Sequence, residues 1–183
     1  NPDLPIIFTS TSKITFPGAG VAVEAASPNN VSLLKERMKY QTIGPDKLNQ
    51  LRHARMFKTP ADIERHMKRH ADILRPKFET VISELEKQLD GTGIARWTNP
   101  RGGYFISLYV LDGCAKRVEQ LCANAGMILT PAGATYPYGV DPDDSNIRIA
   151  PSYPSVEEIE KASVVLCTAV KYAALEKLIA EKR

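Results

Sequence analysis

The stretch FTSTSKITFPGAG, from Phe8 to Gly20, brings together three kinds of group that could do chemistry. Ser10 and Ser12 offer hydroxyl donors, Lys13 offers one amine, and a glycine-containing loop follows directly. A lysine forms a Schiff base with a carbonyl only as the free amine, so it needs surroundings that lower its pKa. Hydroxyls and open backbone N–H groups bind a phosphate. The stretch therefore fits a lysine held for carbonyl chemistry beside a phosphate site.

Two other interpretations of this stretch stay open at the level of the residues. The simpler one is a surface strand end followed by a turn rich in serine and threonine. The other takes Ser10 and Lys13 as the nucleophile and base of an S-x-x-K motif. Enzymes with that motif also carry S-D-N and K-T-G elements, and this chain has neither. Pro17 and two glycines also follow where the motif should open a helix, so this interpretation is disfavoured.

Arg148 is the second candidate functional residue. It stands between Ile147 and Ile149, so on a strand its side chain points away from both. A guanidinium fork in that position can bind a carboxylate through two hydrogen bonds. The alternative is an exposed arginine on the surface of a strand.

Two further groups of polar or aromatic residues each allow two interpretations. Asn49, Arg52 and His53 lie on an expected helix and could contribute to an active site across a dimer. We favour the alternative, a solvated polar face. Tyr136 and Tyr138 could line a substrate entrance, but we favour packing within a loop.

The elements expected in the first half of the chain are two strands and three helices. Apolar runs predict strands over Leu4–Ser10 and Val21–Ser27. Helical spacing predicts one helix from Pro28 to near Gly44 and a second that starts with Pro45 in its first turn. A long helix follows the candidate cap Thr59, should kink at Pro76, and stops at Gly91 and Gly93. An isolated pair of strands is marginal, so the first ~30 residues should form the edge of a larger sheet.

The second half alternates strands and helices, which predicts a small α/β domain from about residue 94 to 183. The expected strands are 104–110, 127–133 and 145–151. Asp112 should cap a helix that Gly126 ends. Ser155 and Glu158 form a capping box for the final helix.

Composition excludes several classes of protein. The net charge is +3, with 24 basic and 21 acidic residues spread along the chain, so no nucleic-acid partner is expected. Three scattered cysteines indicate reduced thiols in a cytosolic protein and no metal site. No apolar run reaches the ~20 residues that span a bilayer, so no membrane partner is expected. The chain lacks an initiator Met and opens almost at once on an apolar strand, so we expect a fragment of a longer protein.

Four elements in order resemble class I/II pyridoxal-phosphate aminotransferases, closest to the aspartate-aminotransferase-like members. They are S-x-S-K with its glycine loop, P-x-G-G-Y-F at Pro100–Phe105, A-G-x-x-x-x-P-A-G at Ala125–Gly133, and SNIRIAPS. The resemblance implies an α/β chain that is the C-terminal part of a pyridoxal-phosphate-dependent transferase fold. Residues 1–30 would then end the sheet of the large cofactor-binding domain, residues 31–92 would be bridging helices, and residues 93–183 would be the small C-terminal α/β domain.

The resemblance also assigns roles to residues. Lys13 corresponds to the lysine that holds pyridoxal 5'-phosphate covalently and later moves the proton. Ser10 and Ser12 correspond to hydroxyls on the cofactor phosphate, and Arg148 to the arginine that binds the substrate α-carboxylate. Many relatives carry an arginine eight positions after the lysine, and this chain has Val21 there. The loop N–H groups, or another basic residue, would have to compensate for that missing charge.

The resemblance finally implies a function and its rivals. The expected activity is transamination between an amino acid, with aspartate as one candidate, and a 2-oxo acid, in a cytoplasmic homodimer. The stacking ring and the partner of the pyridinium nitrogen would lie in the missing N-terminal half, so the fragment should be nearly inactive alone. One rival is an aminotransferase-like ligand-sensing domain of a transcriptional regulator, and another is a dimerising or structural piece.

Overall fold

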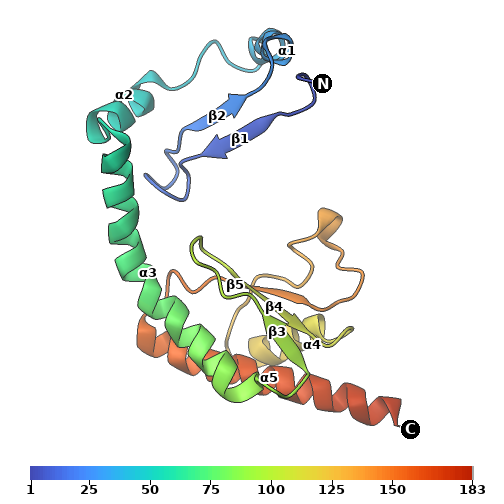
Figure 1. Cartoon of the computed structure of the whole chain (residues 1–183). Coiled ribbons are helices and arrows are strands. Elements are labelled where there is room, and N and C mark those ends of the chain that lie inside the picture. Colours follow the sequence, from blue (N-terminus) through green and yellow to red (C-terminus); the bar gives the residue numbers. More distant parts are fainter. Residues whose placement is uncertain (183) are drawn as a thin grey trace. The chain divides into compact units, whose positions relative to one another are not determined.

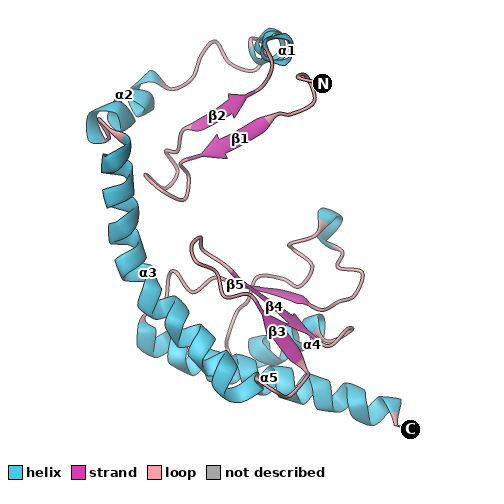
Figure 2. Cartoon of the chain, viewed as in Figure 1, coloured by secondary structure: helices cyan, strands magenta, loops and turns pink. Residues whose placement is uncertain are grey.

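The computed structural model describes residues 1–182, which form two compact units (Figure 1). The first unit runs from Asn1 to His70, and the second begins at Ala71. The boundary falls inside one long helix, α3 (Pro60–Leu89). Helices and strands occur in both units, as Figure 2 shows, so the expected mixed α/β class is confirmed.

The first unit consists of one hairpin and helices. Strands β1 (Ile7–Ser10) and β2 (Ala22–Ala25) pair antiparallel, with Ile7 opposite Ala25 and Ser10 opposite Ala22. Both strands are shorter than the apolar runs that predicted them, and most of their residues are exposed. Two helices follow the hairpin, α1 (Pro28–Met38) and α2 (Lys47–Met56).

The predicted start of α2 needs a correction. The Asp46 side chain caps this helix by accepting a hydrogen bond from the Asn49 N–H. Pro45 therefore precedes the cap and does not stand in the first turn. A carboxylate cap satisfies an otherwise unpaired N–H group, which proline cannot do.

Helix α3 begins and ends where the sequence predicts. At its start the backbone N–H and the hydroxyl of Thr59 both donate to the Asp62 carboxylate, at 2.8 and 3.0 Å. The helix continues through Pro76 as one element and ends at Leu89. Gly91 follows with φ +70°, a backbone conformation that favours glycine, so it stops the helix.

The second unit has a three-stranded antiparallel sheet. The strand order is β3 (Ala95–Trp97), β4 (Ile106–Val110), β5 (Asn146–Ile149), and Ser107 lies opposite Arg148. Helices α4 (Ala115–Asn124) and α5 (Val156–Glu181) complete the unit, together with the short 3-10 helix η1 (Pro137–Gly139). The predicted capping box of α5 is present, because Ser155 and Glu158 bond each other's backbone N–H.

Two predictions for this unit were wrong. Residues 127–133 form no strand, because the Met127 N–H donates to the Cys122 carbonyl and the Ala132 N–H donates to the Glu119 carboxylate. Asp112 does not cap α4. The N–H groups of Ala115 and Lys116 donate instead to the carbonyl and carboxylate of Asp144, which no local sequence pattern indicates.

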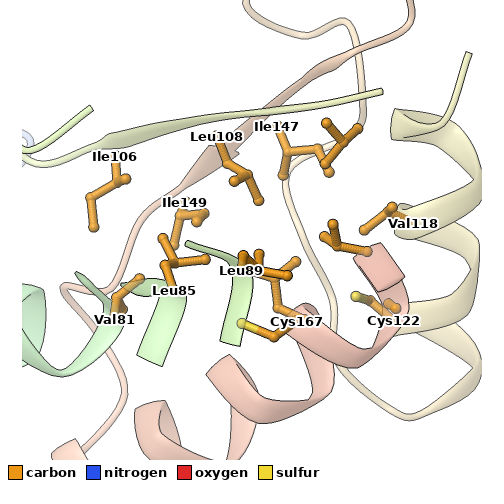
Figure 3. Close-up of a cluster of buried hydrophobic side chains, with 14 of the residues drawn as sticks. Val81, Leu85, Leu89, Ile106, Leu108, Val118, Cys122, Ile147, Ile149 and Cys167 are labelled. Carbon is orange, nitrogen blue, oxygen red and sulfur yellow. The ribbon is translucent and has the colours of Figure 1, made fainter. Parts of the chain in front are cut away.

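The core of the second unit lies between one face of the sheet and the helices. Alternate residues of β4 are buried, as are Ile147 and Ile149 of β5. The last turns of α3 pack against them (Figure 3). The side chains that Figure 3 labels include Val81, Leu85, Leu89, Ile106, Leu108, Ile147 and Ile149. The end of α3 thus belongs to this core. The division at residues 30 and 92, which refers to the domains of a whole enzyme, stays a prediction.

Candidate functional site

Lys13 lies in the loop that joins β1 to β2. Its side chain is exposed, and the loop is closed behind it by two hydrogen bonds between Thr11 and Val21. The Thr11 N–H donates to the Val21 carbonyl at 2.9 Å, and the Val21 N–H donates to the Thr11 hydroxyl at 2.9 Å. The N–H groups of Ile14 and Thr15 both donate to the Thr11 carbonyl, so Lys13 stands on a tight turn.

The two serines that precede Lys13 converge. The Ser10 and Ser12 hydroxyl oxygens are 2.6 Å apart, and the Ser12 N–H donates to the Ser10 hydroxyl at 3.1 Å. Gly20 makes the close approach of the chain possible, since a Cβ there would lie 2.8 Å from the Ser12 hydroxyl oxygen and 3.0 Å from its Cα. The structure therefore brings both predicted phosphate hydroxyls together at the exposed end of β1, directly before Lys13.

Helix α2 supports the loop from the other side. The Asn49 amide donates to the Gly20 carbonyl at 3.1 Å, and the His53 Nε2 lies 2.7 Å from the Thr15 hydroxyl oxygen. Asn49 is only 9% exposed and Thr15 only 8%. The favoured expectation of a solvated polar face is wrong, because two of the three polar side chains on it are bonded to the lysine loop. The third, Arg52, lies over the Phe16 ring.

Arg148 lies in the second unit, on the face of β5 opposite the core. Its neighbours Ile147 and Ile149 are buried, as their alternation predicted. The guanidinium carbon lies 4.6 Å from the centre of the Phe105 ring, and Nη2 is 3.5 Å from the Thr130 hydroxyl oxygen. The Nε atom is buried and has no hydrogen-bond partner among the described residues.

This unpaired donor indicates what Arg148 can bind. A buried N–H group without an acceptor is destabilising, and the cost is larger when the group is charged. A carboxylate accepts from Nε and a terminal nitrogen of one guanidinium at once. The Phe105 ring holds the guanidinium plane in place through a cation–π contact. The arrangement fits an arginine that binds an anionic ligand better than it fits the alternative of an exposed arginine on a strand surface.

Several residues around the two groups were missed by the sequence analysis. Phe105 and Thr130 lie within two of the quoted motifs and Thr15 follows the lysine motif, but no role was assigned to them, and only the fold brings Phe105 and Thr130 to Arg148 and Thr15 to His53. The expectation that Tyr138 packs within its loop is wrong, because its side chain is fully exposed at φ +58°. Tyr136 is half-buried.

Other kinds of site do not emerge from residues 1–182. Within that range, no three His, Cys, Asp or Glu side chains gather closely enough to hold a metal ion. None of its helices has the length and apolar character needed to cross a membrane. The three cysteines are free and buried.

The chain matches known proteins along its described length. The family model described as "Aspartate amino-transferase" matches residues 1–182. A protein of Mycolicibacterium smegmatis that is named an aminotransferase is 46% identical over 182 residues, which is 100% of this chain and 42% of that protein. An aspartate aminotransferase of Corynebacterium glutamicum is 46% identical over 176 residues, which is 96% of this chain and 41% of that protein. The chain thus spans about two fifths of the length of the curated relatives it matches.

The solved structures that resemble this chain are also those of aminotransferases. An aspartate transaminase from Corynebacterium glutamicum has a TM-score of 0.88 at 46% identity, covering 93% of this chain and 40% of that one. Two distant structures resemble the chain in fold alone. An α-aminoadipate aminotransferase of Thermus thermophilus, complexed with N-(5'-phosphopyridoxyl)-L-leucine, has a TM-score of 0.75 at 21% identity and covers 93% of this chain and 42% of that one. A Pyrococcus horikoshii kynurenine aminotransferase in complex with PMP has a TM-score of 0.79 at 20% identity, with 91% and 40% covered.

One relative bears on the rival function. An HTH-type transcriptional regulator of Bacillus subtilis is 24% identical over 162 residues, which is 88% of this chain and 32% of that protein.

Proposed function

Because the chain belongs to the aspartate aminotransferase family, we propose that the protein of which it is part is a pyridoxal-phosphate-dependent aminotransferase. It would move an amino group between an amino acid and a 2-oxo acid. The observation that carries the proposal is the convergence of the Ser10 and Ser12 hydroxyls beside Lys13 in one exposed loop.

The loop residues fit the cofactor. Lys13 would hold pyridoxal 5'-phosphate covalently, and Ser10 and Ser12 would donate to its phosphate. When bound, the cofactor supplies an electron-withdrawing ring that stabilises negative charge on the substrate's α-carbon. The Lys13 amine, once released, would take the proton from that carbon and return it later. Val21 supplies no charge, so part of the positive charge facing the phosphate has to come from elsewhere in the protein.

Arg148 would orient the substrate. Its unpaired Nε–H and a terminal N–H would bind the α-carboxylate that every amino-acid substrate carries. Aspartate is the candidate substrate that the family description and the Corynebacterium glutamicum relative favour. The homodimer, an upstream half that completes the large domain, and a cytoplasmic location stay predictions.

A ligand-sensing domain of a transcriptional regulator is the second candidate. The 24% identical Bacillus subtilis regulator supports it, but the 46% identical relatives are named aminotransferases, so we favour the enzyme. Turnover of an amino acid by the full-length protein separates the two, because a sensing domain needs only to bind its ligand.

Borohydride trapping tests the proposal directly. The full-length protein is incubated with pyridoxal 5'-phosphate, reduced with borohydride and mapped by peptide mass spectrometry. We expect the stable label on Lys13 and, in a separate assay, transamination of an amino acid with a 2-oxo acid. Lys13→Ala should abolish both, whereas Lys58→Ala, an exposed lysine after α2, should change neither. A label on another lysine, with turnover retained in Lys13→Ala, would contradict the assignment.

A further inference from the structure

We propose that His53 is a positioning residue for Lys13, acting through a chain of hydrogen bonds that ends at the Val21 amide. The inference rests on the proposed role of Lys13 for its functional meaning. The bonds themselves lie wholly within the first unit, between α2 and the loop that joins β1 to β2.

The direction of the chain follows from which atoms can donate. His53 Nδ1 lies 2.9 Å from the Asn49 carbonyl oxygen, which only accepts, so Nδ1 carries the hydrogen. In the neutral ring Nε2 is then an acceptor, and the Thr15 hydroxyl at 2.7 Å donates to it. The Thr15 hydroxyl also donates to the Thr11 hydroxyl at 3.0 Å, so its one proton is shared between the two acceptors. Thr11 in turn accepts from the Val21 N–H at 2.9 Å.

The chain of hydrogen bonds holds the backbone on both sides of Lys13 in the sequence. Thr11 and Thr15 each stand two residues from Lys13, and both are tied to one side chain of α2. The Phe16 ring meets the His53 ring edge-on at 5.1 Å, which places the imidazole against the loop. Asn49 holds the far end of the loop through the Gly20 carbonyl.

Burial makes these bonds effective. Thr15 is 8% exposed, so water cannot easily replace the imidazole as its partner. Lys13 itself is exposed, and the local turn bonds to the Thr11 carbonyl shape its backbone without fixing the turn to the rest of the unit. The loop therefore presents Lys13 in a defined direction, because α2 holds it through His53. His53 comes 38 residues after Thr15 in the sequence.

The test compares substitutions that keep the acceptor with substitutions that remove it, in the full-length protein. His53→Gln keeps an oxygen near the Nε2 position, and His53→Phe keeps a ring without an acceptor. Thr15→Ser keeps the hydroxyl, and Thr15→Val removes it with little change of shape. His70→Gln and His70→Phe are matched controls, because the His70 ring contacts the ring of His66, 4.4 Å away in the same helix α3, and belongs to no part of the lysine loop.

The first readout needs no cofactor and no turnover. Hydrogen exchange of the Val21 amide, followed by mass spectrometry of the loop peptide, should be about fivefold faster in His53→Phe and Thr15→Val, the scale for losing one hydrogen bond. The Gln, Ser and His70 variants should exchange within about twofold of the unsubstituted protein. Equal exchange in His53→Phe and His53→Gln would overturn the proposal, as would equal exchange in Thr15→Val and Thr15→Ser.

The second readout connects the chain to Lys13. We expect kcat for transamination to fall at least about tenfold in His53→Phe and to recover in His53→Gln, because small misplacement of a reacting group is costly. The KM for the amino acid should not change, since Arg148 is untouched. An unsubstituted protein without transamination would refute the proposed function and leave the exchange result to decide the hydrogen-bond chain. Turnover with no drop in kcat for His53→Phe would refute the positioning role alone.

Discussion

Single side chains in this protein differ in reactivity because their surroundings differ. Burial raises the pKa of the Cys122 and Cys167 thiols to about 11, and the pKa of Cys114 is raised by burial as well. A thiol reacts as the thiolate, so these cysteines are inert packing residues at neutral pH. Arg148 is the opposite case, because one of its buried donors has no partner among the described residues and is left for a ligand.

Replacing Arg148 by lysine tests this at the level of one residue. Arg148→Lys keeps the charge but loses the fork, so amino-acid binding in the full-length enzyme should weaken by roughly 1.5–3 kcal/mol, the scale for a charged hydrogen bond. Substrate titration measures it. Arg96→Lys is the matched control, since the Arg96 guanidinium also stacks on an aromatic ring, that of Tyr109, at 3.9 Å. Equal effects of the two substitutions, or none for Arg148→Lys, would count against the carboxylate role.

The segment that precedes β5 shows how one carboxylate organises an element. The Asp141 oxygens accept from the backbone N–H groups of Asp143, Ser145 and Asn146, at 3.1, 2.9 and 2.8 Å. Burial by itself would raise the pKa of Asp141, but the hydrogen bonds from Asn146, Ser145 and Asp143 hold the pKa below its ordinary value. Asp141 thus sets where β5 begins, at Asn146, two residues before Arg148.

Asp141→Asn should destabilise the second unit by about 1–3 kcal/mol, because an amide nitrogen replaces one acceptor oxygen and leaves a buried N–H unpaired. Urea unfolding followed by the fluorescence of Trp97, the single tryptophan, measures it. The folded pKa of Asp141 is lowered, so its stabilisation is present above the unfolded pKa of about 4 and is lost as pH falls through the folded value.

The substitution should therefore also remove part of the acid dependence of stability below about pH 4. Asp143→Asn serves as the control, because the Asp143 side chain is exposed and its contribution to the turn is made by its backbone. A loss of stability as large in this control would mean that Asp141 has no special role.

At the scale of the whole molecule, burial is concentrated in the second unit. Its core draws on α3, β4, β5, α4 and α5. Among the described residues of the first unit, only Thr15 and Asn49 are buried, and the hairpin residues Ile7, Phe8 and Val23 are more than half exposed. A two-stranded hairpin is marginal by itself, so we expect further protein to cover the first unit in the full-length protein.

The isolated 183-residue chain should therefore be cut by limited proteolysis first within residues 1–59 and remain resistant in the second unit. It should show almost no transamination, because it spans only about two fifths of the length of the aminotransferases it matches. Mass spectrometry of the early fragments and a coupled transamination assay measure the two effects. The full-length protein with cofactor is the control, in which the hairpin should be protected. Turnover near that of the full-length protein would place the chemistry within this chain.

Local patterns in the sequence predicted much of the fold. The capping box of Ser155 and Glu158, the stop after Leu89 and the outward direction of Arg148 all depend on residues at most four positions apart. Short-range sterics and the two-residue period of a strand act in the same way in any fold, so the sequence alone was enough for these features. The Ser10–Lys13 motif was visible for the same reason, because its members are neighbours in sequence.

Tertiary structure decided what those residues meet. The partners of Lys13's loop come from α2, the ring under Arg148 comes from Phe105, and the N–H groups that start α4 bond to Asp144. Residues 127–133 have the composition of a strand, yet the N–H groups of Met127 and Ala132 find partners in α4, and no strand forms. Each of these outcomes depends on which distant group offers an unpaired donor or acceptor at the right place. That is fixed only when the elements pack, and no local pattern of residues contains it.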